Sequence, residues 1–288
     1  MKQFSSYPIY VVYSKAREEF MYQQAARWST RRDGRDIFNW ITTTGISSEQ
    51  IRPDADSPQS RLYVSTVCRM MNNIASNRLG RLLLNAFPPH NVVYIHPMID
   101  AARQECGGCS ADTIWWNMTV KQGGGRRIAF SPDFDAANAE ETLCHELVHA
   151  MRGSNQFARA TDSIKPEYTD SEEFAAHVIE NMYRSAAGKT TLDYVYGRSD
   201  GHKSLTGSKA SIYHMMVNDE RQIFALKFLL SSDTFCAALS RLKWPDFNPF
   251  RDFETLQRLS INAKMSTLTL DEIRMIFPEY FQTVLRQE

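Results

Sequence analysis

The sequence predicts an α+β protein with a small mixed sheet, a helix that carries the candidate active site, and a mostly helical C-terminal region. Three observations lead to this prediction. Short apolar runs at residues 9–13, 92–95 and 126–130 have the length and flanking turn residues of strands. Longer segments, such as residues 135–153 and 171–186, repeat apolar side chains at helical spacing. The remaining C-terminal part is mostly of this second kind.

The composition excludes several classes of protein. The 288 residues include 33 basic and 33 acidic side chains, so no global positive field attracts nucleic acid. No apolar run approaches the ~18 residues that span a membrane, and residues 9–13 are too short for the core of a signal peptide. The 5 cysteines are odd in number and sparse, which argues against a disulfide framework. We therefore expect no nucleic-acid partner and no membrane insertion.

The chain is predicted to have three parts. Residues 1–60 form an N-terminal region for secretion, targeting or an accessory role, and end in a stretch rich in Ser, Pro and Asp. Residues 61–204 form the catalytic domain. Residues 205–288 form a helical region packed on that domain, with an amphipathic helix at 213–230 and a final helix opened by a capping box at 269–272.

Helix signals divide the central part of the chain. Residues 62–87 are predicted as one helix that stops before a pair of prolines. The next helix opens after Asp135, which can cap it, and ends at Gly153 in a left-handed conformation. A further helix at 171–186 stops before Gly188.

The strongest chemical signal is the sequence His145-Glu-Leu-Val-His149. Side chains four residues apart lie on one face of a helix, so both imidazoles can reach one metal ion. Glu146 lies about 100° around the helix from His145, where it can hold an attacking water molecule. Two such histidines and a carboxylate base form the zincin arrangement. The motif predicts one Zn²⁺ per chain, with Glu146 as the catalytic base.

A catalytic zinc ion needs a third protein ligand. The extended metzincin motif requires Gly and His at positions 152 and 155, where this chain has Arg152 and Asn155, so that class is excluded. The alternative is a glutamate from the helix at 171–186, as in gluzincins. Glu172 and Glu173 point about 100° apart, so one of them ligates, and Glu173 is favoured. His177, one turn after Glu173, is predicted either to support that ligand or to pack in the core.

Less specific signals suggest three further roles. Tyr168 or His202 would donate a hydrogen bond to the oxyanion that develops during catalysis. Residues 126–130 are predicted as an edge strand beside which an extended peptide substrate binds. Cys144 is predicted as an inert buried thiol.

Several segments together carry a family resemblance. They are His145-Glu-Leu-Val-His149-Ala, Glu172-Glu173-Phe-Ala-Ala, Glu180-Asn-Met-Tyr-Arg-Ser, Met71-Asn-Asn-Ile-Ala-Ser and Gly80-Arg-Leu-Leu-Leu. Over about residues 62–200 the chain resembles the NleD-like effector metalloproteases of bacteria.

This resemblance implies a zincin-like fold and a zinc-dependent endopeptidase of the gluzincin type. It implies ligation by His145, His149 and either Glu172 or Glu173, with Glu146 as base. It also implies a secreted bacterial effector or toxin. Such a protein resides in the bacterial cytoplasm before export by a specialised secretion system, and then in the target-cell cytoplasm. The expected partners are a protein or peptide substrate in the target cell and a secretion chaperone.

Two other functions stay open at this level. A zincin-fold amidase would act on cell-wall peptides or on a non-peptide amide. A catalytically inactive module would use the metal only to stabilise a surface that binds a partner. Glu146 distinguishes the last alternative, because only an enzyme needs its carboxylate.

Overall fold

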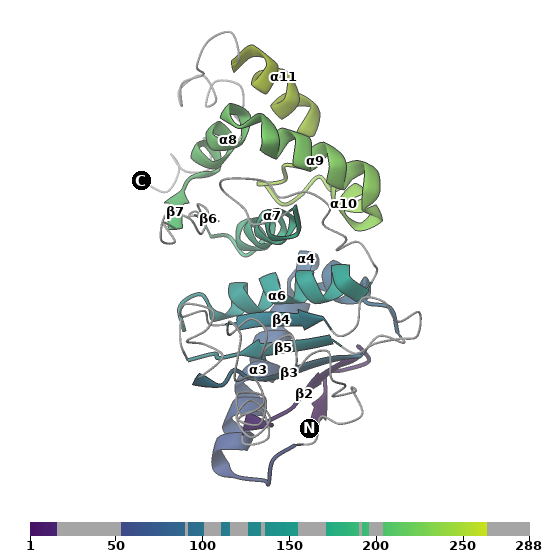
Figure 1. Cartoon of the computed structure of the whole chain (residues 1–288), viewed down its shortest axis with the longest axis vertical. Coiled ribbons are helices and arrows are strands. Elements are labelled where there is room, and N and C mark those ends of the chain that lie inside the picture. Colours follow the sequence, from purple (N-terminus) through teal and green to yellow (C-terminus); the bar gives the residue numbers. More distant parts are fainter. Residues whose placement is uncertain are drawn as a thin grey trace, which may run out of the picture. The chain divides into compact units, whose positions relative to one another are not determined.

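The computed structural model describes residues 1–15, 53–89, 92–100, 111–115, 126–133, 136–154, 171–189, 192–195 and 204–263. The chain divides into two compact units, Met1–Gln156 and Phe157–Glu288. Helices and a mixed sheet are both present, which confirms the predicted α+β class (Figure 1). None of the helices described is long and apolar enough to cross a membrane.

The first unit is built on a mixed sheet in which the described strands have the order β1-β2-β3-β5-β4. β2, β3 and β5 are parallel to one another, whereas β1 and β4 run antiparallel to their neighbours. The three predicted strands are confirmed as β2, β3 and β5. The strands are β1 (Lys2–Gln3), β2 (Ile9–Val11), β3 (Val93–Pro97), β4 (Ala111–Trp115) and β5 (Arg126–Phe130).

One face of the parallel strands supplies the core of this unit. The register places Val11 beside Ile95 and Ile95 beside Ile128, and all three side chains are fully buried. Helix α3 (Pro58–Ser76) packs near this face, where the Tyr63 hydroxyl donates to the backbone oxygen of Phe130 at 3.3 Å. Burial raises the pKa of Tyr63 well above its usual value, so this hydroxyl keeps its proton and remains a donor.

The helix predicted at residues 62–87 is present, but it is divided into α3 and α4 (Arg78–Asn85). Asn77 has an extended backbone conformation that ends α3, and its side chain accepts from the Leu79 amide at 2.8 Å to begin α4. The prediction of one helix was therefore wrong in this detail. The periodicity of apolar residues continues through the break because a single Asn serves both helices as a cap.

Gly80 allows α4 to lie against the end of α3. A methyl group at this position would lie 2.0 Å from the backbone oxygen of Ile74. Real Cβ atoms do not approach a backbone oxygen this closely, so any other residue would force the two helices apart.

Helix α6 (Ala139–Ser154) carries the motif that begins at His145. Glu140 and Glu141 lie in its first turn, where the positive end of the helix dipole stabilises carboxylates. Gly153 was expected to end the helix, but the helix continues to Ser154, so that expectation was wrong. A helical Gly costs only about 1 kcal/mol relative to Ala, which packing can offset. The expected cap, Asp135, lies outside the described residues.

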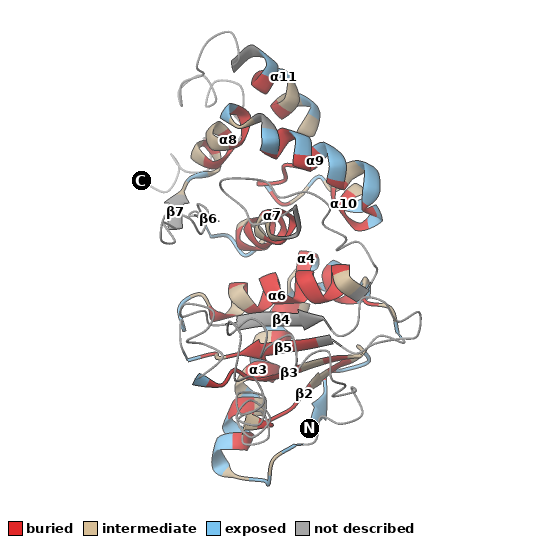
Figure 2. Ribbon diagram, viewed as in Figure 1, coloured by how far each residue is buried: buried red, intermediate tan, exposed pale blue. Residues whose placement is uncertain are grey.

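Helices dominate the second unit, and their buried faces are shown in red in Figure 2. Helix α7 has the predicted bounds, and Gly188 follows it with a φ of +76°, which favours Gly over other residues. The elements are α7 (Ser171–Ala186), β6 (Leu192–Val195), β7 (Ser204–Gly207), α8 (Lys209–Asn218), α9 (Glu220–Ser232), α10 (Thr234–Leu239) and α11 (Phe253–Ala263).

The amphipathic helix predicted at residues 213–230 is divided into α8 and α9. Asp219 lies between them in an extended conformation, and its side chain accepts from the Arg221 amide at 3.0 Å to begin α9. The division has the same physical cause as the one at Asn77, since a capping side chain interrupts a continuous apolar pattern. The helix predicted from residue 269 lies outside the described residues.

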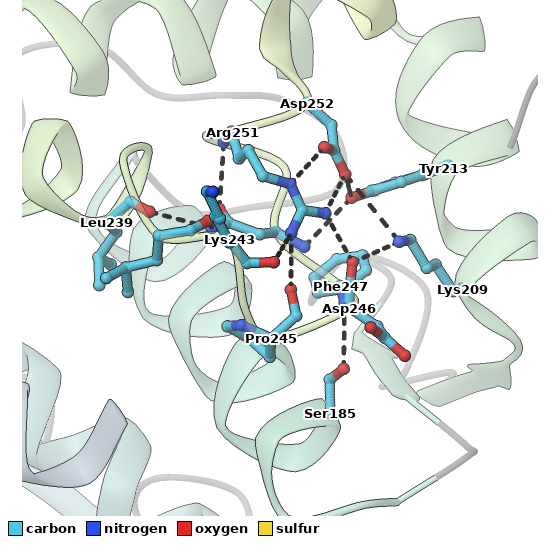
Figure 3. Close-up of polar contacts among 12 residues, drawn as sticks. Ser185, Lys209, Tyr213, Leu239, Lys243, Pro245, Asp246, Phe247, Arg251 and Asp252 are labelled. Carbon is cyan, nitrogen blue, oxygen red and sulfur yellow. Dashed lines mark hydrogen bonds and ion pairs between the residues drawn. The ribbon is translucent and has the colours of Figure 1, made fainter. Parts of the chain in front are cut away.

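A polar network fixes the segment that leads into α11 (Figure 3). Asp252 accepts from the Tyr213 hydroxyl at 2.6 Å and from Nε of Arg251 at 2.7 Å. Arg251 also donates to the backbone oxygens of Lys243 and Pro245, both at 3.0 Å. Its Nη2 atom donates to the backbone oxygen of Asp246 and to the second carboxylate oxygen of Asp252, both at 2.9 Å. All the N–H groups of this guanidinium therefore have acceptors.

Candidate metal centre

The first part of the candidate metal centre is a pair of histidines on α6. His145 and His149 are one helical turn apart and both are buried. Their Nε2 atoms lie 3.0 Å apart, and their rings are inclined by 74° with centroids 4.7 Å apart. The predicted convergence of these two side chains on one face of the helix is therefore present.

This separation fits a pair of zinc ligands. Two imidazole nitrogens at about 2.05 Å from one zinc ion, with a tetrahedral angle between them, would lie about 3.3 Å apart. The observed 3.0 Å is within a few tenths of an ångström of that value. Two nitrogens this close cannot both carry a proton facing the other. The pair therefore either shares one proton or turns both lone pairs toward a cation.

Glu146 lies between the two histidines in sequence and is also buried, with 7% of its surface exposed. The helix around it packs by apolar side chains, since Leu143, Leu147 and Met151 are fully buried. Burying a carboxylate costs free energy unless the group is paired or serves a function. The sequence predicts that Glu146 transfers a proton during catalysis.

Helix α7 of the second unit carries two side chains of metal-ligand type. Glu173 and His177 are four residues apart, so they lie on the same face of that helix, and both are partly exposed. Nδ1 of His177 lies 3.4 Å from a carboxylate oxygen of Glu180. The other oxygen of Glu180 lies 3.8 Å from Arg184.

Among the residues that the structure describes, His145, Glu173 and His177 are the side chains that qualify as a metal-binding group. This supports a metal-binding His/Glu group in the protein, whereas the identity of the ion stays a prediction. His177 was not predicted as a ligand. The signal that could have found it is its spacing of four residues from Glu173, which matches the spacing of His145 and His149.

The other predicted site residues are Tyr168, His202 and Glu172. Tyr168, His202 and the side chain of Glu172 lie outside the described residues, and their roles stay predictions. Cys144 is buried, as expected, and is not part of a disulfide.

The predicted edge strand is wrong. β5 (Arg126–Phe130) pairs with β3 on one side and with β4 on the other, so its backbone groups already belong to the sheet. β4 (Ala111–Trp115) is the last strand at this end of the described sheet, and α6 packs against it. The error has a physical origin: apolar runs such as 126–130 are typical of interior strands, whereas β4 includes the polar residues Asp112 and Thr113.

We compared the chain with models of protein families, with curated proteins and with solved structures, and none of them matches it. The family resemblance of the motifs is thus a prediction that rests on the motif residues.

Proposed function

We propose that this protein is a zinc-dependent metalloendopeptidase with a zincin-like fold. The observation that carries the proposal is the 3.0 Å separation between the Nε2 atoms of His145 and His149 on a buried helix, with Glu146 next to His145 in sequence. A helical His-Glu-x-x-His motif supplies the ligands and the base in this class of hydrolase. Helix α7 carries a partly exposed glutamate and histidine, which are ligand types that complete such a site.

Each side chain has a role in the proposed reaction. His145, His149 and Glu173 hold the zinc ion, with Glu172 as the alternative third ligand. When bound, zinc supplies Lewis acidity that polarises a peptide carbonyl and acidifies a water molecule. Glu146 accepts the proton of the attacking water and then delivers it to the leaving amine.

A donor to the developing oxyanion completes the chemistry. Tyr168 and His202 are the proposed donors, because a phenol or an imidazole can stabilise that charge. Removing such a donor costs about 10²- to 10³-fold in kcat in hydrolases, without loss of the metal. The same measurement on Tyr168→Phe and His202→Gln therefore assigns the role.

We propose β4 as the strand beside which the substrate binds. An extended peptide can add to the edge of a sheet through main-chain hydrogen bonds. β4 is the end strand of the described sheet and packs against α6, the helix with the motif. This position suits a peptide whose scissile bond must reach the side chains of that helix.

The family resemblance extends the proposal to biological context. The substrate would be a protein of a target cell, reached after export from the bacterial cytoplasm by a specialised secretion system, with a secretion chaperone as a further partner. In this view residues 61–204 form the catalytic domain, residues 1–60 serve export or an accessory role, and residues 205–288 form a helical region.

A peptide-library digest read by mass spectrometry tests the proposed function. The zinc-supplemented wild type should cleave peptide bonds, whereas Glu146→Gln should not. Glu140→Gln is the matched control, because Glu140 is in the same helix and its partner, the Asn73 side chain at 2.8 Å, can still donate to a glutamine oxygen. Cleavage of cell-wall peptides alone would favour the amidase alternative. No turnover of any substrate, with a biological effect that survives Glu146→Gln, would favour the interaction module.

A further inference from the structure

A row of ionisable side chains follows one face of α7. Glu173, His177, Glu180 and Arg184 are separated by four, three and four residues, which is the spacing of one helical face. Glu180 and Arg184 are each only 7% exposed. The neighbouring positions of the helix are apolar and buried, including Phe174 at 0%. Charged groups at such depth are costly, so their arrangement requires a physical reason.

His177 is the central member of this row. Its Nδ1 atom faces Glu180 at 3.4 Å, and the side chains of the two residues are 14% and 9% exposed. Nδ1 and Nε2 lie on opposite sides of the imidazole ring, so a carboxylate at Nδ1 leaves Nε2 facing away from Glu180. The negative charge of this nearby carboxylate favours a proton on Nδ1, and the lone pair then lies on Nε2, as in a histidine that binds a metal.

Arg184 completes the arrangement on the far side of Glu180. Its Nη1 atom lies 3.8 Å from Oε1 of Glu180, whereas His177 faces Oε2. The carboxylate is thus placed between a fixed positive charge and the imidazole. The two oxygens of Glu180 thus face two different basic side chains, Arg184 and His177.

We propose that His177 is a metal ligand and that Glu180 is the residue that positions it. The inference rests on the proposed function, because it adds a ligand to the same metal centre. Metal-binding histidines commonly donate their second ring N–H to a carboxylate, which fixes the ring and makes the ligand more basic. His177 also belongs to the group of described side chains that could hold an ion. Zinc in hydrolases accepts five ligands as well as four, so this ligand is compatible with water at the site.

The test is the zinc affinity of the full chain, measured by competition with a chromogenic chelator. Loss of an outer carboxylate partner typically weakens metal affinity about 10- to 100-fold. We expect Glu180→Gln to fall in that range and His177→Ala to lose at least as much. Glu254→Gln, at an exposed position in the first turn of α11, is the matched control and should bind zinc as the wild type does.

A second variant separates positioning from helix stability. Glu180→Gln disturbs the contacts with both His177 and Arg184, whereas Arg184→Met leaves the contact between His177 and Glu180 in place. We expect Arg184→Met to lose much less zinc affinity than Glu180→Gln. Equal losses in both variants would assign the effect to the stability of α7 and would overturn the proposal. Thermal melts of the metal-free proteins report that stability directly. If His177→Ala does not fold, Glu180→Gln carries the test alone, because glutamine preserves the shape of the side chain.

Cobalt provides an independent spectroscopic readout, because the visible absorption of Co²⁺ depends on its ligands. His177→Ala should change the spectrum of the cobalt-loaded protein, and Glu254→Gln should not. If His177→Ala and Glu180→Gln bind zinc like the wild type while His145→Ala does not, the inference about His177 is wrong and the proposed function stands. If the wild type binds no zinc at all, the proposed function fails and this inference fails with it.

Discussion

The Nε2 atoms of His145 and His149 lie 3.0 Å apart on the buried face of α6. The helix places the two side chains on one face, one above the other, and their ring orientations bring the two nitrogens together. A third ligand would complete the protein ligands of a zinc ion. The function proposed above depends on this pair more than on any other contact.

Glu146→Gln should abolish peptide hydrolysis while leaving the zinc affinity unchanged. General acid–base catalysis contributes about 10² to 10⁴ in rate, and glutamine cannot accept the proton from water. The measurement is turnover of a cleaved library peptide, with zinc content determined on the same samples. Activity within a few-fold of that of Glu140→Gln would show that Glu146 is not the base.

Stability should fall between pH 6.5 and pH 4 because of His96 on β3. Burial lowers the pKa of His96 to about 4, although its contact with the Pro97 oxygen at 3.0 Å opposes the shift. Its Nε2 atom has no hydrogen-bond partner among the described residues. Between these pH values His96 is protonated in the unfolded chain but neutral in the folded chain. The free energy of unfolding therefore decreases as the pH falls.

The expected loss is about 1.4 kcal/mol per pH unit and roughly 3 kcal/mol in total. Denaturant unfolding at several pH values, with a chelator present to remove metal effects, measures it. His96→Gln should flatten the curve over this range. Parallel curves for the variant and the wild type would contradict the assignment.

Gly80→Ala should destabilise the first unit by about 1–3 kcal/mol. Alanine favours helices over glycine by about 1 kcal/mol, but here its Cβ would meet the Ile74 oxygen at 2.0 Å. The clash outweighs the propensity because the obstacle is backbone rather than a flexible side chain. Chemical denaturation gives the sign, and a stabilised Gly80→Ala variant would show that α4 does not approach α3 this closely.

Gly188→Ala provides a comparison with a different physical cause. No atom lies within 4 Å of the added methyl group, but the backbone φ is +76°. The expected cost is about 1–2 kcal/mol, from the left-handed conformation alone.

Asp252→Asn should destabilise the second unit by about 2 kcal/mol without changing zinc affinity. Its carboxylate accepts from Arg251 at 2.7 and 2.9 Å and from the Tyr213 hydroxyl at 2.6 Å. Charge-assisted hydrogen bonds of this kind contribute about 1.5–3 kcal/mol. Asp246→Asn is the control, because Asp246 enters the network through its backbone oxygen. Equal melting temperatures for the two variants would contradict the role of the network.

Much of the fold follows from local patterns in the sequence. The strands β2, β3 and β5 are short apolar runs, and α6 and α7 have the predicted helical periodicity. The breaks at Asn77 and Asp219 were missed because capping competes with a continuous apolar pattern. β4 was missed, and with it the edge of the sheet, because strand order is set by pairing between distant segments.

The candidate site, like the fold, could be predicted from the sequence only in part. The spacing of His145 and His149 is a property of one helix, so the sequence predicts it directly. The role of His177 could not be decided from spacing alone, since the same pattern suits a core histidine. Its 3.4 Å contact with a carboxylate oxygen of Glu180 is a feature that only the structure shows.

The zinc content of the purified protein, measured by elemental mass spectrometry, tests the central claim most directly. We predict about one zinc ion per chain for the wild type, and almost none for His145→Ala and His149→Ala. Glu140→Gln should retain the wild-type content. A wild type that stays free of zinc after supplementation, or one that keeps its zinc when either histidine is replaced, would contradict the claim that this pair binds the ion.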